Sequence, residues 1–360
     1  MADQEQENSK ITEEFIPARQ TKPSRRRLTL GFWITFLLAI LAVVVCALIY
    51  KTGFTFSQMT VGGSDSTGLL PVSENAATPT PESDRINILL LGLRGEDNPN
   101  GGLLTDSIMV ASIKKSTGQL ALISLPRDLY IEIPGQNGLK EKINFAHALG
   151  YEKKGVAGGM YLSKIAVSRV TGLYISQVIT INHEAFREIV DILGGIDIYL
   201  DKPFQEKTQF AKEILIDLPV GQNHLDGTTA LYFVRSRFST SDFDRARRQQ
   251  AVLLAIKDKA LSLGFLGNPV KIFQVLESLG RNIKTDASFS DLGSLLGWAQ
   301  DIQDPKVIHK VFDTTPEGLL YSSTSASGAY ILLPIGDDFS KIQAACRQIF
   351  NSAPEAAGSQ

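Results

Sequence analysis

The sequence predicts an α/β protein: a three-layer α-β-α sandwich around a central mixed sheet, which follows one N-terminal transmembrane helix. Short continuous apolar runs, such as Ile86–Gly92 (INILLLG), are typical of strands that are buried on both faces. Helical segments alternate with these runs, and this order favours a sheet covered by helices on both sides. The membrane helix is predicted by Leu28–Tyr50, a run without any charged residue.

The apolar run Leu28–Tyr50 would form a helix about 34 Å long, enough to cross a hydrocarbon core of roughly 30 Å. Arg25, Arg26 and Arg27 precede it, and only Lys51 follows closely. Because positive charge stays on the cytoplasmic side, we expect a single-pass cell-membrane protein with its N-terminus inside and its main domain outside. A cleaved signal peptide is the alternative, but no small residues suited to a cleavage site follow the run.

The chain divides by composition into five parts. Residues 1–27 are polar and are expected to form a disordered cytoplasmic tail, followed by the anchor at 28–50. Residues 51–84 are rich in Gly, Ser, Thr and Pro and predict a flexible linker. The main α/β domain is expected at 85–265. Residues 266–360 are expected to form a C-terminal extension that covers this domain or makes an appended lobe.

The predicted elements follow from apolar runs and their breaks. After Ile86–Gly92, strands are expected at 107–113, 120–124, 178–181 and 196–200, with a helix at 183–193 that Gly194 and Gly195 end. In the C-terminal part we expect helices near 269–280 and 288–302, strands at VIHKVF and YILLP, and a last helix at 339–350.

Composition and motifs exclude several classes of protein. The net charge of −2 argues against a general nucleic-acid binder. The two cysteines, Cys46 and Cys346, cannot build a thiolate zinc site, and no two of the four histidines have metal-ligand spacing. The sequence has no phosphate-binding GxxxxGK[ST] loop, no HExxH motif and no visible arrangement for serine or cysteine catalysis.

Five arginines gather in Tyr232–Gln250 (YFVRSRFSTSDFDRARRQQ): Arg235, Arg237, Arg245, Arg247 and Arg248. A helix from Asp244 would turn Arg245, Arg248 and Gln249 toward the core and Arg247 away from it. A buried guanidinium needs an anionic partner. That partner is either a structural network with Asp242 and Asp244 or a bound oxyanion. Two carboxylates neutralise only two of the five arginines, and a helix N-terminus suits phosphate, so we favour the oxyanion.

Two further charged residues stand at the ends of predicted strands. Arg127 follows the strand 120–124, and Asp106 precedes the strand 107–113. Ligands of open α/β sheets bind beyond the carboxyl ends of strands, which favours a site there. Taken alone, Arg127 could equally form an ordinary strand-end ion pair, and Asp106 could be a turn or capping residue.

Several segments together resemble the LytR–CpsA–Psr family. They occur in the family's order: INILLLG, TDSIMVASI, ISLPRDLYIEIPG, KINFAHALG, VDILGGIDIYL, LDGTTALYFVRSR and DFDRARRQQ. The resemblance covers Ile86 to Lys259. Two places depart from the family pattern. Leu104 and Thr105 stand where members often carry an arginine and a small residue, and Asp244 stands where a glycine is common.

The resemblance implies a phosphotransferase at the outer face of the cytoplasmic membrane. Such enzymes move a glycopolymer, such as teichoic acid or capsule, from a polyprenyl-pyrophosphate carrier to peptidoglycan and form a phosphodiester. It implies that a prenyl chain lies in an apolar tunnel of the α/β domain. Two alternatives stay open: a lipid-pyrophosphate hydrolase with the same site, and a non-catalytic polyprenyl-phosphate-binding or regulatory membrane protein.

The resemblance also implies roles for single residues. The pyrophosphate would be bound by Arg127, Arg235, Arg237, Arg245, Arg248 and Gln249, and the catalytic residues would be Asp106, Arg127 and Arg245. Asp106 would bind Mg²⁺ or another divalent cation, or would activate the accepting hydroxyl. Asp242 would support the arginines.

Overall fold

The computed structural model describes residues 60–61, 79–95, 98, 102–207, 216–237, 240–261, 280, 282–288, 291 and 307–351. The expected anchor at 28–50 and most of the linker lie outside this part, as do nearly all residues of the helices expected at 269–280 and 288–302. Among the described residues, no helix has the length and apolar character needed to span a membrane.

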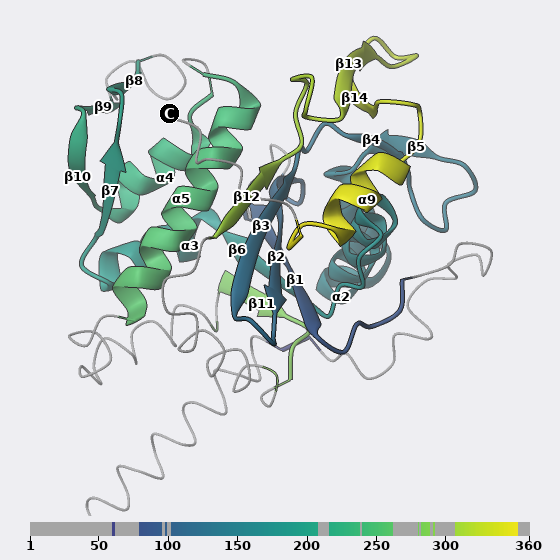
Figure 1. The fold of residues 1–360 in the computed structure, drawn as a ribbon, viewed down its shortest axis with the longest axis horizontal. Helices are drawn as coiled ribbons and strands as arrows, with labels where there is room; N and C mark the ends of the chain where they lie inside the picture. The colour runs from purple at the N-terminus through teal and green to yellow at the C-terminus, as the bar shows by residue number, and fades with distance from the viewer. Residues whose placement is uncertain are drawn as a thin grey trace, which may run out of the picture. The chain divides into compact units, whose positions relative to one another are not determined.

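A mixed six-stranded sheet forms the centre of the fold (Figure 1). Its strand order is β11-β6-β1-β2-β3-β12. The strands are β1 (Arg85–Leu93), β2 (Thr105–Lys114), β3 (Gln119–Leu125), β6 (Gln177–Asn182), β11 (Ile283–Thr285) and β12 (Ile308–Val311). β1, β2 and β3 form an antiparallel meander, and β6 and β12 join it in parallel to β1 and β3. The expected α/β fold with a central mixed sheet is therefore confirmed.

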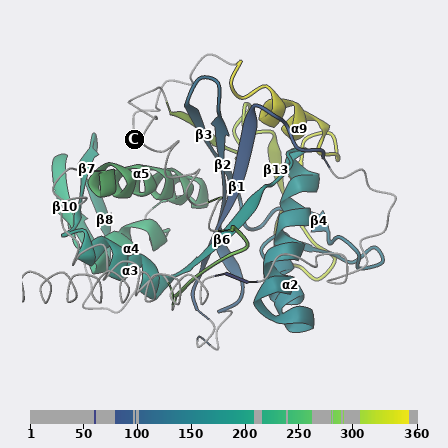
Figure 2. The same ribbon diagram turned by 90° about the horizontal axis from the view of Figure 1, so that it is seen from below.

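Helices cover both faces of this sheet (Figure 2). On one side lie α2 (Phe145–Thr171) and α9 (Ser340–Arg347), and on the other lie α3 (His183–Ile192), α4 (Gly227–Arg235) and α5 (Asp242–Leu261). One core cluster joins the sheet to α2 through Leu91, Val110 and Leu162. Another joins the opposite face to α5, where Met109 and Leu122 pack with Leu253. Strands buried on both faces explain the continuous apolar runs in the sequence.

The long helix α2 was not predicted, because its segment contains several glycines. Lys154 and Gly155 have non-helical backbone angles and interrupt it. A Cβ added to Gly158 would lie 2.2 Å from the carbonyl oxygen of Gly150, and Gly150 is constrained in the same way by Gly158. The glycines therefore permit a close approach of two backbone segments, a contact that the local sequence pattern does not indicate.

Eight short strands form four two-stranded sheets outside the central one. These sheets are β4 (Tyr130–Glu132) with β5 (Lys140–Lys142), β7 (Ile196–Leu200) with β10 (Gly221–Leu225), β8 (Phe204–Glu206) with β9 (Ile216–Leu218), and β13 (Leu320–Thr324) with β14 (Tyr330–Pro334). The predicted strand at 196–200 is thus present as β7 but lies outside the central sheet. Its side chains alternate between buried and exposed, as expected for a strand with one solvated face.

The residues after 266 do more than cover the main domain. β12 pairs with β3, and β11 pairs with β6, so these residues supply both edge strands of the central sheet. Phe312, Leu332 and Ile342 are buried in the same core cluster as β1 and α2. In the described part of the chain, the C-terminal residues therefore share the core of the α/β domain and do not form an appended lobe.

The register of the sheet brings four strand ends to one edge. Leu93 at the end of β1 is paired with Thr105 at the start of β2 and with Asn182 at the end of β6. Leu125 at the end of β3 is paired with Ile108 in β2. The residues that follow these ends are therefore neighbours in space although the chain separates them widely.

Candidate active site

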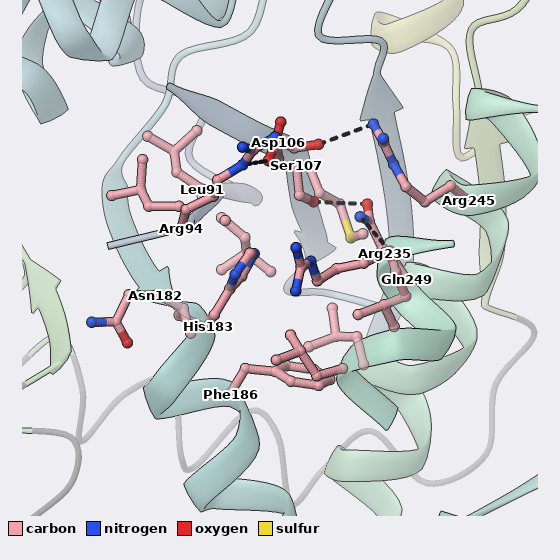
Figure 3. Close-up of a pocket in the computed structure, with 18 of the residues that line it drawn as sticks. Leu91, Arg94, Asp106, Ser107, Asn182, His183, Phe186, Arg235, Arg245 and Gln249 are labelled. Carbon is pink, nitrogen blue, oxygen red and sulfur yellow. Dashed lines mark hydrogen bonds and ion pairs between the residues drawn. The ribbon is translucent and has the colours of Figure 1, made fainter. Parts of the chain in front are cut away.

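A cavity of about 250 Å³ lies between this edge of the sheet and helices α3, α4 and α5 (Figure 3). Its polar wall is formed by Arg94, Asp106, Arg127, His183, Arg235, Arg237, Arg245 and Gln249 together with Ser107 and Asn182. Its apolar wall includes Leu90, Met109, Phe186, Ile189, Leu231, Leu253 and Ile256. The cavity thus joins a cationic region to a hydrocarbon-lined region.

Asp106 lies between two arginines that come from different strand ends. Arg127 Nη1 lies 2.6 Å from Asp106 Oδ1, and Arg94 Nε lies 2.8 Å from Asp106 Oδ2. Burial alone would raise the pKa of the Asp106 carboxyl, but Arg94 and Arg127 outweigh burial and lower that pKa. Asp106 is therefore an ionised carboxylate that holds two guanidinium groups in the wall of the cavity.

Arg94 compensates for one departure from the family pattern. The arginine that members often carry just before the aspartate is absent at Leu104. In the structure, Arg94 reaches the same carboxylate from the end of β1, the strand that is paired with β2 (Figure 3). The positive charge beside Asp106 is thus supplied by Arg94, although position 104 carries no arginine.

Arg127 lies within ion-pair distance of three carboxylates. Besides Asp106, its Nε lies 3.6 Å from Asp128 Oδ2 and 3.8 Å from Asp242 Oδ2. Burial opposes its charge, but Asp242, Asp106 and Asp128 outweigh burial and raise its pKa. Within the described structure, the buried Nε makes no hydrogen bond. A buried donor of this kind suits an additional acceptor such as a phosphate oxygen.

Arg245 stands in the first turn of α5 and is buried, as the helix phase predicts. Its Nη2 donates to Asp242 Oδ2 at 2.8 Å and to the carbonyl oxygen of Asp106 at 3.2 Å. Burial lowers its pKa, and Asp242 acts in the opposite direction. Asp242 therefore orients Arg245 and lies near Arg127, in agreement with the supporting role expected for it.

Arg235 and Arg237 line the cavity from the end of α4 and the residues that follow it. Burial lowers the pKa of Arg235, and the charge of Arg94 adds to this effect, which shows that the two guanidiniums share one region.

Gln249 connects this region to the sheet. Its Oε1 accepts a 2.9 Å hydrogen bond from Ser107 Oγ, and its Nε2 donates to the carbonyl oxygen of Val234 at 3.3 Å.

Arg248 is buried as predicted, but the structure does not place it in the cavity wall. Its guanidinium donates to the carbonyl oxygens of Phe233 and Ser236 and, at 3.0 Å, to Thr240 Oγ1. It also lies 4.7 Å from the ring centre of Phe204. The expected contact of Arg248 with pyrophosphate stays a prediction, and this placement does not favour it. Its charge is satisfied by backbone carbonyls and an aromatic ring that tie α5 to α4.

Asp244 and Arg247 lie away from the cavity. The side chain of Asp244 accepts from the backbone nitrogen of Ser241 at 3.1 Å, while Ser241 Oγ accepts from the backbone nitrogen of Asp244 at 3.1 Å. This reciprocal pattern caps the N-terminus of α5. Arg247 is paired with Asp244 and Asp313, each at 3.0 Å. The second departure from the family pattern thus serves helix capping and leaves the anion site unaffected.

His183 and Arg94 are site residues that sequence reasoning missed. His183 is the first residue of α3, directly after the end of β6, and it lines the cavity. Burial, aided by Arg235, lowers the pKa of its imidazole to about 4, so it is neutral near pH 7. Both residues follow strands whose carboxyl ends meet at one edge. The rule that singled out Arg127 therefore would have found them as well.

The residues around Asp106 do not suit a divalent cation held by protein ligands. Asp106 is the one predicted ligand, and each of its oxygens is bonded to a guanidinium. In the described part of the chain, no three His, Cys, Asp or Glu side chains are grouped as a metal site. The expectation of Mg²⁺ at Asp106 stays a prediction that this geometry does not favour.

The lining is strongly cationic. Five arginines face the cavity, and Asp106 is the only carboxylate among its described lining residues. Guanidinium groups match phosphate oxygens in two-point geometry, and their attraction is strong where water is scarce. The arrangement can therefore bind a compound that carries both phosphate groups and an extended hydrocarbon.

Comparison with known proteins agrees with this geometry. The model of the LytR_cpsA_psr family matches residues 54–344. The chain belongs to the LytR–CpsA–Psr family. TagU of Bacillus cereus, a polyisoprenyl-teichoic acid–peptidoglycan teichoic acid transferase, is 31% identical over 242 residues, which cover 64% of this chain and 72% of TagU. TagU of Oceanobacillus iheyensis is 30% identical over 292 residues, covering 78% and 85% of the two chains.

Solved structures of family members share the fold. TagT bound to LIIa-WTA superposes with a TM-score of 0.58 at 24% identity, over 78% of this chain and 97% of TagT. TagV of B. subtilis superposes with a TM-score of 0.58 at 22% identity, over 76% of this chain and all of TagV (100%). The matches extend beyond the segments from which the sequence predicted the family, and they include C-terminal residues of the chain.

Proposed function

We propose that this protein transfers a teichoic-acid-like glycopolymer from a polyisoprenyl-pyrophosphate carrier to peptidoglycan and forms a phosphodiester. The names of the TagU relatives describe transfer of teichoic acid from a polyisoprenyl-linked form to peptidoglycan. These relatives are 31% and 30% identical to this chain over 242 and 292 residues. The alternatives of a hydrolase or a non-catalytic binding protein have no observation of their own in their favour.

The cavity is the observation that carries the proposal. A polyprenyl pyrophosphate has an apolar chain joined directly to two phosphate groups. The cavity has a wall of Phe186, Leu231 and Leu253 joined directly to arginines such as Arg235 and Arg245. Neither half of the cavity alone identifies the ligand, but few metabolites match both halves.

The lining residues supply what a phosphoryl transfer needs. The sugar hydroxyl of the acceptor attacks the phosphorus that carries the polymer, and the bond from this phosphorus to the bridging oxygen breaks. The carrier monophosphate leaves with the electrons of that bond. Arg127, Arg235 and Arg245 stabilise the charge that develops on the phosphate oxygens. The hydroxyl proton passes to Asp106, since a carboxylate serves this purpose in other phosphoryl transfers.

The location of the reaction also belongs to the proposal. The donor is held in a membrane, and the acceptor is the cell wall. An anchor at Leu28–Tyr50 with Arg25–Arg27 on the cytoplasmic side would hold the α/β domain at the outer membrane face. This topology places the cavity where both substrates are present.

The products of the reaction test the proposal. The purified full-length protein is incubated with a polyprenyl-pyrophosphate-linked teichoic acid, with and without peptidoglycan fragments. We expect polymer joined to peptidoglycan through a phosphodiester, and little polymer release when the fragments are absent. Rapid release of free phosphorylated polymer in both samples would instead identify a hydrolase.

A further inference from the structure

We propose that Arg94 supplies the positive charge that a divalent cation would otherwise provide beside Asp106, so that this protein binds the carrier pyrophosphate without a metal ion. The inference rests on the proposed function, because it concerns how the same cavity holds the phosphate groups. It assigns to Arg94 a role that the sequence did not indicate.

Both oxygens of the Asp106 carboxylate are already bonded to arginine side chains. Arg94 Nε and Arg127 Nη1 lie 2.8 Å and 2.6 Å from the two oxygens of Asp106. These are distances of charge-assisted hydrogen bonds. A divalent cation bound to Asp106 would be brought close to two fixed guanidiniums, which repel it.

The carboxylates beside Arg127 are also paired with cationic side chains. Asp242 Oδ2 is bonded to Arg245 at 2.8 Å, and Asp128 Oδ1 is bonded to Lys142 at 2.6 Å. Each carboxylate near Arg127 is thus already neutralised by a cationic side chain. A cation that prefers several oxygen ligands would have to displace these side chains as well as Arg94.

The lining of the cavity carries a net positive charge. The described lining holds five arginines and the single carboxylate of Asp106, a formal sum of 5 − 1 = +4. A pyrophosphate substituted at both ends carries roughly one negative charge on each phosphate, as phosphodiesters do. The fixed side chains therefore exceed the charge of the ligand, so metal neutralisation is not required.

The position of Arg94 suits this purpose. It follows β1, whereas Arg127 follows β3, and the two are bonded to different oxygens of Asp106. The side chain of Arg94 is 33% exposed, compared with 15% for Arg127. Arg94 can therefore turn part of its planar fork toward an entering phosphate while Asp106 keeps it close.

Binding of farnesyl pyrophosphate to the purified full-length protein tests the inference. Its affinity is measured by calorimetry in EDTA and in excess Mg²⁺. We expect the two dissociation constants to agree within about twofold. Loss of binding in EDTA, or a weakening of about tenfold or more, would overturn the inference and leave the proposed function intact. Binding in neither buffer would overturn both.

A substitution tests the role of Arg94 directly. Arg94→Asp places a second carboxylate beside Asp106 and removes the guanidinium. We expect this variant to gain a Mn²⁺ site, detected by electron paramagnetic resonance, and to bind farnesyl pyrophosphate only when metal is present. Lys153→Asp makes the same change of charge at an exposed residue that bonds to Gln136 outside the cavity, and it is expected to gain no such site.

The wild-type protein provides the opposite test. We expect it to bind no more Mn²⁺ than Asp106→Asn does. A wild-type Mn²⁺ signal that disappears in Asp106→Asn would show that Asp106 holds a metal and would overturn the inference.

Discussion

Arg245 and Arg248 lie three residues apart on α5 and are both buried, yet their guanidiniums bond to different groups. Arg245 faces the cavity and bonds to Asp242, whereas Arg248 bonds to the carbonyl oxygens of Phe233 and Ser236. One arginine therefore belongs to the anion site, and the other joins two helices.

We expect substitution of these two residues to separate activity from stability. Arg245→Ala should lower the transfer rate about a hundredfold, roughly 3 kcal/mol of transition-state stabilisation, with little change in melting temperature. Arg248→Ala leaves buried carbonyls without donors and should cost about 3 kcal/mol of folding free energy. Arg247→Ala is the control for activity: it should change the transfer rate little, whereas loss of the ion pair with the buried Asp313 should lower stability. Unchanged stability in Arg248→Ala would contradict the structural role.

The apolar half of the cavity can be tested by filling it. Leu253 lines the arginine-rich cavity, whereas the next residue, Leu254, lines a different cavity on the other side of α5. We expect Leu253→Trp to weaken binding of farnesyl pyrophosphate by about tenfold or more, because it occupies space needed by the prenyl chain. Binding of inorganic pyrophosphate should change little. Leu254→Trp is the matched control, and an equal loss there would indicate a general effect on folding.

Asp106→Asn should separate binding from transfer. The carboxamide keeps the shape of the carboxylate but removes its charge, which leaves Arg94 and Arg127 less well oriented. The net positive charge of the cavity increases, so affinity for the pyrophosphate should be kept or strengthened. The turnover rate should fall about a hundredfold. A fully active Asp106→Asn protein would exclude both proton transfer and positioning by this residue.

His183 should make the folding stability dependent on pH. Its pKa falls from 6.5 in the unfolded chain to about 4 in the fold, mainly because of burial. Between these values the unfolded state binds the proton and the folded state does not, so stability is lost as pH falls below 6.5. Urea unfolding at pH 7 and pH 5 should show an extra loss of about 2 kcal/mol in wild type relative to His183→Gln. Parallel pH dependence in the two proteins would show that folding does not lower the pKa of His183.

The expected topology can be tested in cells. Protease added to intact spheroplasts should digest the domain that begins near Arg85, because Arg25–Arg27 would hold the opposite end inside. A cytoplasmic marker protein should survive the same treatment. Protection of the domain until the membrane is permeabilised would reject the topology and, with it, a role in the cell wall.

The strands and the helix phase were accessible from sequence because they depend on local patterns. Ile86–Gly92 is apolar along its whole length, since β1 is buried on both faces of the sheet. The phase of α5 correctly buried Arg245 and Arg248 and left Arg247 partly exposed. Such patterns depend only on the rotation between successive side chains along one strand or helix.

Other features depend on contacts between distant segments and had no local signal. No helix was expected at α2, whose glycines are needed where Gly150 meets Gly158. β12 joins the sheet beside β3, although about 180 residues separate the strands. The hydrophobic pattern of a strand indicates which of its faces are buried, but it does not identify the strand that pairs with it.

The sequence by itself determined the α/β class, the family, and the arginines and aspartate that stand at strand and helix ends. The tertiary structure decided which of these residues meet. It placed Arg94 and Arg127 on the two oxygens of Asp106, and it turned Arg248 toward carbonyl oxygens and away from the cavity. Helix phase fixes the direction of a side chain relative to its own axis, but the partner it finds there depends on strand order and register, which arise from packing of the whole chain.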